Sequence, residues 1–574
     1  MKRKNNNTSE VKHEKKLNKK LRNIRIEVCI ILFVFVTLMF FVSVSMRSEY
    51  KDYVATDHHH HLTATAVIFT NNWLDDGIFN DHFAMMPNPH SVEFETLKDR
   101  SFYDSYPPGC ILPLYFLAKV MGKTEITFGF VQRWNLFNQY AITLLLAFIV
   151  YLLFIRMKKN MYIGAIAAVI PVVINLFMPA PFYFFHSVYF SDQAVLLPFV
   201  LTIFLEVLRW FITEPKGKKI LAVCEGIVIF FGTLTDYLYV CFLIVLYVKR
   251  LVMKEISFKS IGAFLKDSIL LAMPALIAAG LFVIQIIVNG PVRIIEMFLY
   301  RTGAVESPWV EHFERVFWTD HIGAGYGTSA HFILKAALVA LLLMIVLYIV
   351  LVLFKKYENR NVAEVLSVAA LVIVPCFIQV YLLKNHSAIH DFSSLKFSIV
   401  LSIVPYVLLP IVATCFLEDA IKKNNPKSKC VIMETVLMLL VIINCVNVTS
   451  YHKEKAKEFF PAPEPRYERV GNFIKNNTDF YDIVFSNNYV IDESNNCPQS
   501  IAFSKKRVYN MFNKEEIYEK VKNLSGDYVI NIFSNGRGAD GELAEIAKKA
   551  TEVKEENGMY LYKIQKADFL ALVE

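Results

Sequence analysis

The chain has 574 residues, of which 55% are hydrophobic, 14% aromatic and only 20% charged. This composition, gathered into long uninterrupted apolar runs, excludes a single soluble core, a solvated helical bundle and a disordered chain, and it predicts a membrane protein. The net charge of +8 comes mainly from the N-terminus and from short segments between apolar runs. It therefore carries topology information and does not indicate a nucleic-acid-binding patch.

The first apolar run, residues 26–46, follows a basic N-terminal tail, residues 1–25. It is too long for the apolar core of a signal peptide and has no small-residue cleavage site after it. We interpret it as a retained signal anchor.

A bilayer-spanning helix needs about 20 mostly apolar residues. Eleven runs qualify, at 26–46, 131–155, 161–179, 192–212, 220–235, 237–253, 268–289, 332–354, 362–383, 396–416 and 430–449. The sequence therefore predicts a polytopic α-helical membrane protein with about 11 transmembrane helices between residues 26 and 449.

The short basic loops predict the orientation, because Lys and Arg are retained on the cytoplasmic side during insertion. All of these loops fall on the same side as the N-terminus: 156–160, 214–219, 249–254, 355–360 and 422–429. We expect a cytoplasmic N-terminus, a plasma-membrane location and, after eleven spans, an extracellular region at residues 450–574.

The larger polar segments fall on the external side, and the first is the loop 47–130. Its run Asp57 to His61, DHHHH, is expected to be an exposed loop and not a metal site. Asp75, Asp76 and His82 follow in TNNWLDDGIFNDHFAM, ahead of the SYPPG segment that contains Tyr106. A carboxylate beside aromatic side chains near a membrane can act as a general base, because partial desolvation raises its pKa. A solvated acidic loop is the alternative.

Two further acids lie at the outer ends of predicted spans, Asp192 in YFSDQAVLLPF and Asp236 in GTLTDYLYV. An ionisable residue at membrane depth is costly, which makes each a functional candidate. Helix capping competes with this interpretation, because a carboxylate that precedes a helix accepts its free N–H groups.

The external loop 290–331 carries Arg293 and Arg301 among several aromatic side chains. A guanidinium group matches phosphate oxygens in a bidentate way, whereas an aromatic plane suits a sugar face or a prenyl chain. An amphipathic helix lying on the membrane is equally compatible with this composition.

The segment KNHSAIHDFSSLKF is the densest polar cluster at the external face. It contains Lys384, His386, His390, Asp391 and Lys396. The i, i+4 spacing of its histidines is compatible with a metal site or with phosphate recognition. We favour contact with a lipid phosphate, because the two lysines would otherwise sit unpaired beside hydrocarbon.

The C-terminal region, residues 450–574, predicts a small external α/β domain in which helix-like and strand-like segments alternate. It contains neither a G-x-G-x-x-G motif nor a P-loop, so we assign it a docking or lid role. The chain's nine cysteines form no C-x-x-C pair and predict neither a disulfide framework nor a zinc site.

Together these features resemble the GT-C superfamily of polyprenyl-phosphate-sugar glycosyltransferases, and within it the protein O-mannosyltransferases and bacterial aminoarabinose transferases. The resemblance rests on the membrane plan, the acidic pair in the first external loop, the Y-P-P-G at 106–109 and the H-x-x-x-H-D-F at 386–392. It implies that Asp75 or Asp76 is the catalytic base and that Asp192 and Asp236 line the cavity. The usual Asp-Glu pair and an interspersed sugar-binding domain are absent from this sequence.

The function expected from this resemblance is transfer of a sugar from a polyprenyl-phosphate donor to a glycan, lipid or protein acceptor outside the cell. A transporter or lipid flippase is the alternative, although the sequence shows none of the internal repeats typical of transporters. A non-catalytic scaffold would not need acids and cations clustered at one face. No cofactor is firmly implied, and a divalent cation remains open. Membrane lipids are expected partners and nucleic acid is not.

Overall fold

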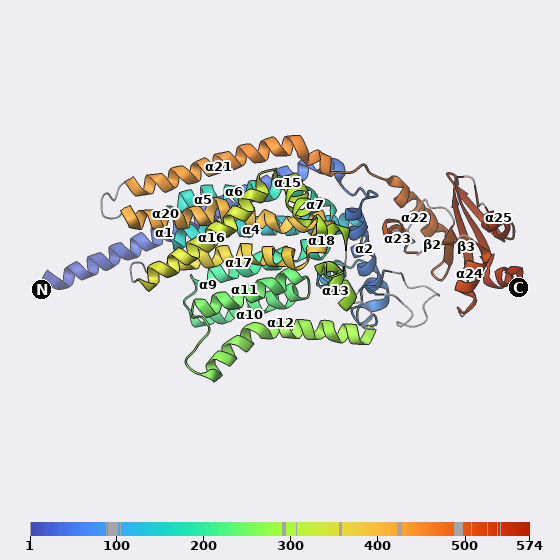
Figure 1. Cartoon of the computed structure of the whole chain (residues 1–574), viewed down its shortest axis with the longest axis horizontal. Helices are drawn as coiled ribbons and strands as arrows, with labels where there is room; N and C mark the ends of the chain where they lie inside the picture. The colour runs from blue at the N-terminus through green and yellow to red at the C-terminus, as the bar shows by residue number, and fades with distance from the viewer. Residues whose placement is uncertain are drawn as a thin grey trace.

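The computed structural model describes residues 2–87, 89, 102–103, 105–289, 294–305, 307–354, 359–421, 428–486, 498–506, 508–511, 513–524, 526–536, 538–539 and 541–573. Figure 1 shows an elongated bundle of helices with the N-terminus at one end and a small sheet-containing part at the other. Helices α2, α13 and α18 lie at the end of the bundle that carries this part.

In the first half of the chain, the elements that the structure describes are helices and helical turns. Its longer helices are α1 (Lys2–Met46), α2 (His58–Asn72), α3 (Leu112–Val120), α4 (Phe128–Arg156), α6 (Val169–Phe177), α7 (Pro179–Ser187), α9 (Leu196–Arg209), α10 (Pro215–Thr233), α11 (Tyr237–Val252) and α12 (Ile261–Asn289). Shorter turns connect them: η1 (Ser48–Tyr50), η2 (Trp73–Gly77), η4 (Pro108–Cys110), α5 (Met161–Ala167) and α8 (Ser191–Ala194).

The second half of the bundle continues in the same way. It contains α13 (Ile294–Thr302), α14 (Pro308–Glu311), η5 (Glu314–His321), α15 (Ile322–Tyr326), α16 (Ala330–Leu353), α17 (Arg360–Leu382), α18 (Lys384–Ile389), η6 (Asp391–Leu395), α19 (Lys396–Ile403), η7 (Val404–Leu408), α20 (Leu409–Ile421), α21 (Ser428–Lys455) and η8 (Ala456–Phe459).

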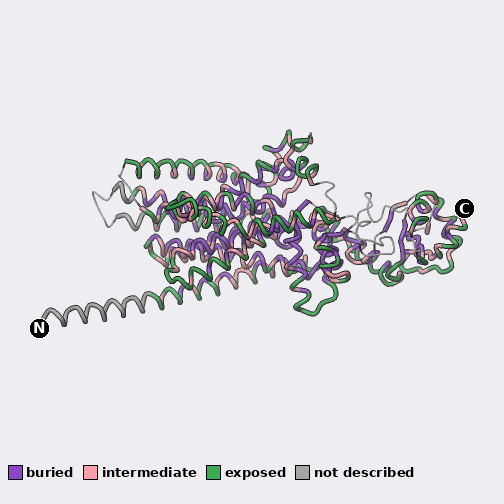
Figure 2. Tube along the Cα trace, turned by 90° about the horizontal axis from the view of Figure 1, so that it is seen from below, coloured by how far each residue is buried: buried purple, intermediate pink, exposed green. Residues whose placement is uncertain are grey.

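Eight stretches of the described chain are helical, long and apolar enough to cross a membrane. They are Arg22–Met46, Phe128–Arg156, Ser191–Arg209, Ile261–Val288, Ala330–Leu353, Arg360–Leu382, Asp391–Leu417 and Glu434–Phe459. The pair Met161–Phe177 and Pro179–Ser187, bent by 54°, makes nine if it counts as one span. Helices α12 and α16 expose Leu, Ile and Val side chains, as a lipid-facing surface requires. Figure 2 shows exposed residues along the outside of the bundle and buried ones within it.

The predicted count of eleven spans is not confirmed. Two predicted spans, 220–235 and 237–253, coincide with α10 and α11, which pack against α9, α12 and α17 inside the bundle. Helix α11 has only 16 residues, and α10 includes Lys216, Lys218, Lys219 and Glu225 among its 19 residues. Both therefore fall short of the length and composition of a regular span.

A buried ion-pair network fastens α9, α10 and α11 to one another. Glu206, which is fully buried, accepts from Lys249 Nζ at 2.7 Å and from Arg250 Nη2 at 2.5 Å. Arg250 also binds Glu225, and Lys249 reaches Glu255 at 2.5 Å. Inside a membrane bundle such pairing offsets the large cost of removing charge from water.

The C-terminal part is built around a five-stranded sheet in the order β2-β1-β3-β5-β4. Strand β1 runs parallel to β2 and β3, whereas β5 runs antiparallel to β3 and β4. Its elements are α22 (Pro465–Asn477), β1 (Ile483–Ser486), α23 (Pro498–Ser504), β2 (Val508–Asn510), α24 (Lys514–Val521), β3 (Val529–Asn535), α25 (Gly541–Ala547), β4 (Glu552–Glu556), β5 (Met559–Gln565) and α26 (Lys566–Val573).

The sheet-containing part docks on α2 and on the segment before it. Helix α23 packs along α2, and the rings of Phe128 and Phe503 stack with centroids 5.2 Å apart. The Glu464 amide donates to the Val54 carbonyl at 2.8 Å. The first predicted external loop therefore forms the seat of the C-terminal part.

The buried network predicts a strong stability effect at Glu206. Glu206→Gln should lower the free energy of unfolding by about 3–5 kcal/mol, because it removes the carboxylate that Lys249 and Arg250 share and leaves the buried network with excess positive charge. Glu314→Gln is the matched control, since Glu314 pairs with Lys335 at 2.9 Å but is 60% exposed, and it should cost less than about 1 kcal/mol. Reversible unfolding of the detergent-solubilised chain measures both. Equal losses would show that the network does not stabilise the bundle.

Candidate functional site

Five charged or titratable side chains from five different helices gather at the end of the bundle near the C-terminal part. We call Asp192, Asp236, Arg301, His386 and Lys396 the mouth cluster. Their exposed fractions are 5%, 1%, 9%, 6% and 3%, so all of them are removed from water. The sequence singled out each residue separately, and the fold brings them together.

Short local motifs hold the two acids in place. Asp236 N-caps α11 by accepting from the Leu238 amide at 2.7 Å, so the predicted capping role is confirmed there. Gln379 from α17 donates to the same carboxylate oxygen at 2.7 Å. Asp192 lies in the first turn of α8 and is not its N-cap; its Oδ2 lies 3.4 Å from His386 Nε2.

The Y-P-P-G segment places Tyr106 beside this cluster. A Cβ at Gly109 would come within 2.3 Å of the Leu234 carbonyl oxygen, and the Gly109 amide donates to that carbonyl at 2.7 Å. Only glycine permits this approach to the end of α10, next to Asp236. The Tyr106 hydroxyl then lies 3.4 Å from His386 Nε2, and the Arg301 guanidinium lies 4.1 Å from the centre of its ring.

Several polar atoms of the mouth cluster have no hydrogen-bond partner among the residues that the structure describes. They include Asp192 Oδ1, Asp236 Oδ2, Arg301 Nη1 and Lys396 Nζ. Both cations are close enough to act electrostatically on both carboxylates. Burying such groups unpaired costs from about 1 kcal/mol to several. Because the fold retains these four atoms despite this cost, we infer that they have a function. A charged or hydroxylated ligand would supply hydrogen-bond partners for them.

Histidine protonation in this region follows from burial. Burial lowers the pKa of the His386 imidazole, although contact with Asp192 opposes the shift. A neutral imidazole next to Asp192 can orient the carboxylate and leave its other oxygen available.

The DHHHH run is not the exposed loop that the sequence predicted. Asp57 is the N-cap of α2 and accepts from the His60 amide at 3.1 Å, while His59 Nε2 lies 2.7 Å from Asp391 Oδ1. His58 stacks on His390 with ring centroids 5.0 Å apart. The run was misread because helix capping, which the leading Asp allows, turns four polar residues into a helix start packed against the 384–396 segment.

This second group, the histidine cluster (Asp57, His58, His59, His390 and Asp391), adjoins the mouth cluster. The rings of His386 and His390 are 4.6 Å apart. Burial opposes charge on His59, but hydrogen bonds to Asp391 and Asp57 prevail and raise its pKa to about 9. A protonated His59 between two carboxylates fixes the start of α2 against the mouth.

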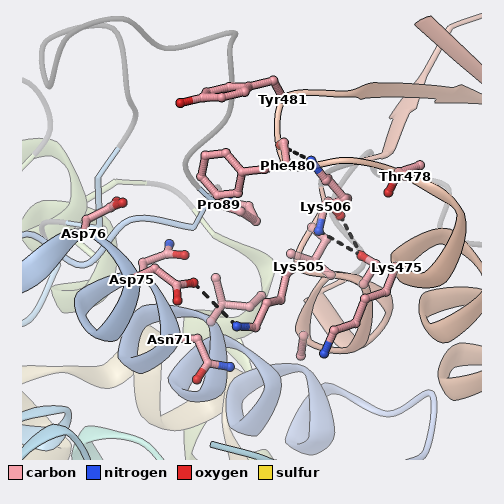
Figure 3. Close-up of a pocket in the computed structure, with 15 residues that line it drawn as sticks. Asn71, Asp75, Asp76, Pro89, Lys475, Thr478, Phe480, Tyr481, Lys505 and Lys506 are labelled. Atoms are coloured by element: carbon pink, nitrogen blue, oxygen red, sulfur yellow. Dashed lines mark hydrogen bonds and ion pairs between the residues drawn. The ribbon is translucent and has the colours of Figure 1, made fainter. Parts of the chain in front are cut away.

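Asp75 and Asp76 lie at the junction with the C-terminal part. They sit in η2, a π-helical turn that ends at Gly77 with φ +90°. Asp75 Oδ2 lies 3.6 Å from Lys505 Nζ. Burial raises the pKa of Asp75, and Lys505 opposes this effect. Both acids line a cavity of about 510 Å³, the junction cavity, shown in Figure 3. Their role as catalytic bases stays a prediction.

The remaining predicted site residues have less distinctive surroundings. His82 is exposed on a turn with φ +48°, and Lys384 is half-buried at the start of α18. Arg293 lies outside the described residues. Sequence reasoning missed Gln379 and Tyr103, which bind Asp236 and Arg301, because a single amide or phenol gives no signal until its partner is known.

No group of three or more His, Cys, Asp or Glu side chains in the described parts of the chain is arranged to hold a metal ion. A divalent cation therefore stays a prediction from residue type alone.

The chain matches no protein-family model and no curated protein. Among solved structures it is similar to ArnT from Cupriavidus metallidurans bound to undecaprenyl phosphate, with a TM-score of 0.48, 11% identity and coverage of 93% of this chain and 97% of that one. It is also similar to the archaeal oligosaccharyltransferase AglB from Archaeoglobus fulgidus in complex with an inhibitory peptide and a dolichol-phosphate, with a TM-score of 0.47, 12% identity and coverage of 93% and 74%.

A second AglB structure, in complex with Zn and sulfate, has a TM-score of 0.44 at 10% identity and covers 86% of this chain and 67% of that one.

Two buried lysines provide a test of whether the mouth cluster is unsatisfied. Lys249→Met should lower the free energy of unfolding by about 3–5 kcal/mol, because it removes a buried cation that two acids, Glu206 and Glu255, share and leaves the network with excess negative charge. Lys396→Met should change it by less than about 1 kcal/mol, because removing a cation without a hydrogen-bond partner also removes its desolvation cost. Thermal unfolding of the two variants in the same detergent measures the contrast. A loss at Lys396 as large as at Lys249 would mean that Lys396 is already paired.

Proposed function

We propose that this protein is a membrane glycosyltransferase of the GT-C type, which moves a sugar from a polyprenyl-phosphate donor to an acceptor hydroxyl at the mouth cluster. The acceptor is an envelope glycan, a lipid or a protein. The observation that carries the proposal is the set of buried, unpaired atoms on two acids and two cations at one end of an apolar bundle.

The two cations suit the phosphate of the donor. Arg301 offers Nη1, and Lys396 offers its whole ammonium group. A sugar phosphate ester already has a stable anion as its leaving group, so the protein needs mainly to hold and neutralise the phosphate oxygens.

Asp192 is the base that the geometry favours. Its Oδ2 contacts His386 and its Oδ1 is available, so this carboxylate can take the proton of an acceptor hydroxyl. The hydroxyl oxygen then attacks the anomeric carbon, with inversion, and polyprenyl phosphate leaves. Asp236, held by Gln379 and the start of α11, shapes the opposite side.

Asp75 and Asp76 remain the competing candidates for the base, on the strength of the family resemblance. Asp75 is 39% exposed and paired with Lys505, which is a poorer setting for proton abstraction than the buried mouth.

Exchanging each acid for its amide separates the two assignments. Asp192→Asn should reduce turnover by at least about a hundredfold, because general-base catalysis contributes about 10²–10⁴, while donor affinity stays within about threefold of wild type. Lys396→Met should instead weaken donor binding. Transfer from a radiolabelled polyprenyl-phosphate sugar, together with donor binding in detergent, gives both quantities.

Three outcomes would contradict the assignment of Asp192. The first is full turnover in Asp192→Asn. The second is complete loss in the double variant Asp75→Asn, Asp76→Asn with unchanged affinity for donor and acceptor, which would make one of those two the base. The third is loss of donor binding in Asp192→Asn, which would make Asp192 a ligand of the phosphate.

We further propose that the mouth cluster and the C-terminal part face the outside of the cell. The support is the positive charge of the loops on the N-terminal side of the predicted plan.

A cysteine introduced at Lys554, on β4 and 42% exposed, should react with a membrane-impermeant maleimide on intact cells. A cysteine at the exposed Lys218 should react only after permeabilisation. Signals are compared with the parent chain, and the reverse pattern would invert the topology.

A further inference from the structure

The junction cavity is a second chemically distinct site. It lies between η2 of the membrane part and the segments around α22 and α23 of the C-terminal part, and its volume is about 510 Å³. This is within the size range of small-molecule sites, about 300–1,000 Å³. Because each part supplies one side, the cavity exists only when the C-terminal part is docked.

Aromatic rings form the wall on the C-terminal side. Phe480 and Tyr481 line the cavity and remain 50% and 56% exposed, with ring centroids 4.9 Å apart. Figure 3 shows Pro89 beside the Phe480 ring, with Asp75 and Asp76 across the cavity from the two rings. Two adjacent exposed aromatic rings beside polar groups suit a ligand that has an apolar face and polar substituents.

The charges around the cavity are largely neutralised by one another. Lys505 Nζ lies between Asp75 Oδ2 at 3.6 Å and Glu125 Oε2 at 3.2 Å, and Lys475 reaches the same Glu125 oxygen at 3.2 Å. Lys506 Nζ donates to the Phe480 carbonyl, and burial lowers the pKa of Lys506 to about 8. Three cations and the three acids Asp75, Asp76 and Glu125 leave little net charge for an ionic ligand.

We propose that the junction cavity is a saccharide-binding site that takes a short uncharged glycan. Sugar rings combine apolar C–H faces, which stack on aromatic planes, with hydroxyl groups, which donate to carboxylates and accept from ammonium and amide groups. The cavity supplies Phe480 and Tyr481 for the first and Asp75, Asp76 and Lys505 for the second.

Resting on the proposed function, this site deepens it: the acceptor is a glycan, held at the junction while its reactive hydroxyl reaches toward the mouth cluster. Part of the acceptor is then recognised by the C-terminal part, which consequently takes part in substrate selection. Asp75 and Asp76 serve as hydrogen-bond acceptors for the glycan in this arrangement.

The test is saccharide binding to the full chain in lipid nanodiscs, measured on an array of neutral and anionic oligosaccharides and then by fluorescence anisotropy with the best binder. At least one neutral oligosaccharide should bind. Tyr481→Ala should weaken its binding about tenfold, equivalent to about 1.4 kcal/mol, and Tyr481→Phe should retain it, because the ring is kept. Phe79→Ala is the matched control: Phe79 is 77% exposed, close in sequence to Asp76, and does not line the cavity.

The proposal is overturned if no neutral oligosaccharide binds, if Tyr481→Ala binds as tightly as Phe79→Ala, or if only anionic glycans bind. Donor transfer is measured separately on the same preparations. If glycan binding depends on Tyr481 but the chain transfers no sugar, the saccharide site is supported and the proposed function is wrong. If the chain transfers sugar but binds no glycan, the saccharide site is wrong and the proposed function is supported.

Discussion

A charged group among membrane helices needs a partner from the protein or from a ligand, because the bilayer core contains no water to solvate it. The structure contains both solutions. Around Glu206, three acids and three bases of α9 to α11 and the turn that follows are matched at ion-pair distances. At the mouth cluster, two acids and two cations are similarly buried, yet each keeps an atom that has no hydrogen-bond partner among the described residues. The ion pairs around Glu206 hold helices together, whereas the mouth cluster is available to bind a ligand.

The sequence predicted the bundle well because spanning helices are a one-dimensional property, readable from twenty consecutive residues. It was less successful where tertiary packing decides. Helices α10 and α11 were predicted as spans, but α11 has only 16 residues and α10 carries four charged residues, of which Glu225 is buried and paired with Arg250. In the C-terminal part, the helices and strands with clear periodicity match α22, β1, α24, β3, α25 and β5, whereas the three-residue β2 was too short to see.

The candidate site shows the same division. Asp192, Asp236, His386 and Lys396 were conspicuous as polar residues near the ends of apolar runs, and Arg301 stood in an external loop. The family resemblance implied that Asp192 and Asp236 line one cavity, but the residue pattern alone did not give their contacts with Arg301, His386 and Lys396. Asp57 to His61 was misread because its partners lie on the distant segment 384–396. Asp75 and Asp76 matched a family pattern locally, while their surroundings depend on Lys505, far along the chain. Residue type can identify candidate site residues, but long-range contacts determine which of these candidates lie in the same site.

The ion pairs around Glu206 also bear on how the chain is made. Glu206 and Glu225 leave the ribosome before Lys249 and Arg250, so their carboxylates enter the membrane region with their later partners still unsynthesised. Lys249 and Arg250 help to set the topology when α11 is inserted, and afterwards they form ion pairs with Glu206 and Glu225. Helices α9, α10 and α11 are therefore expected to settle as one cooperative unit, and a translocation machinery or lipid headgroups must shelter the two early carboxylates until α11 emerges.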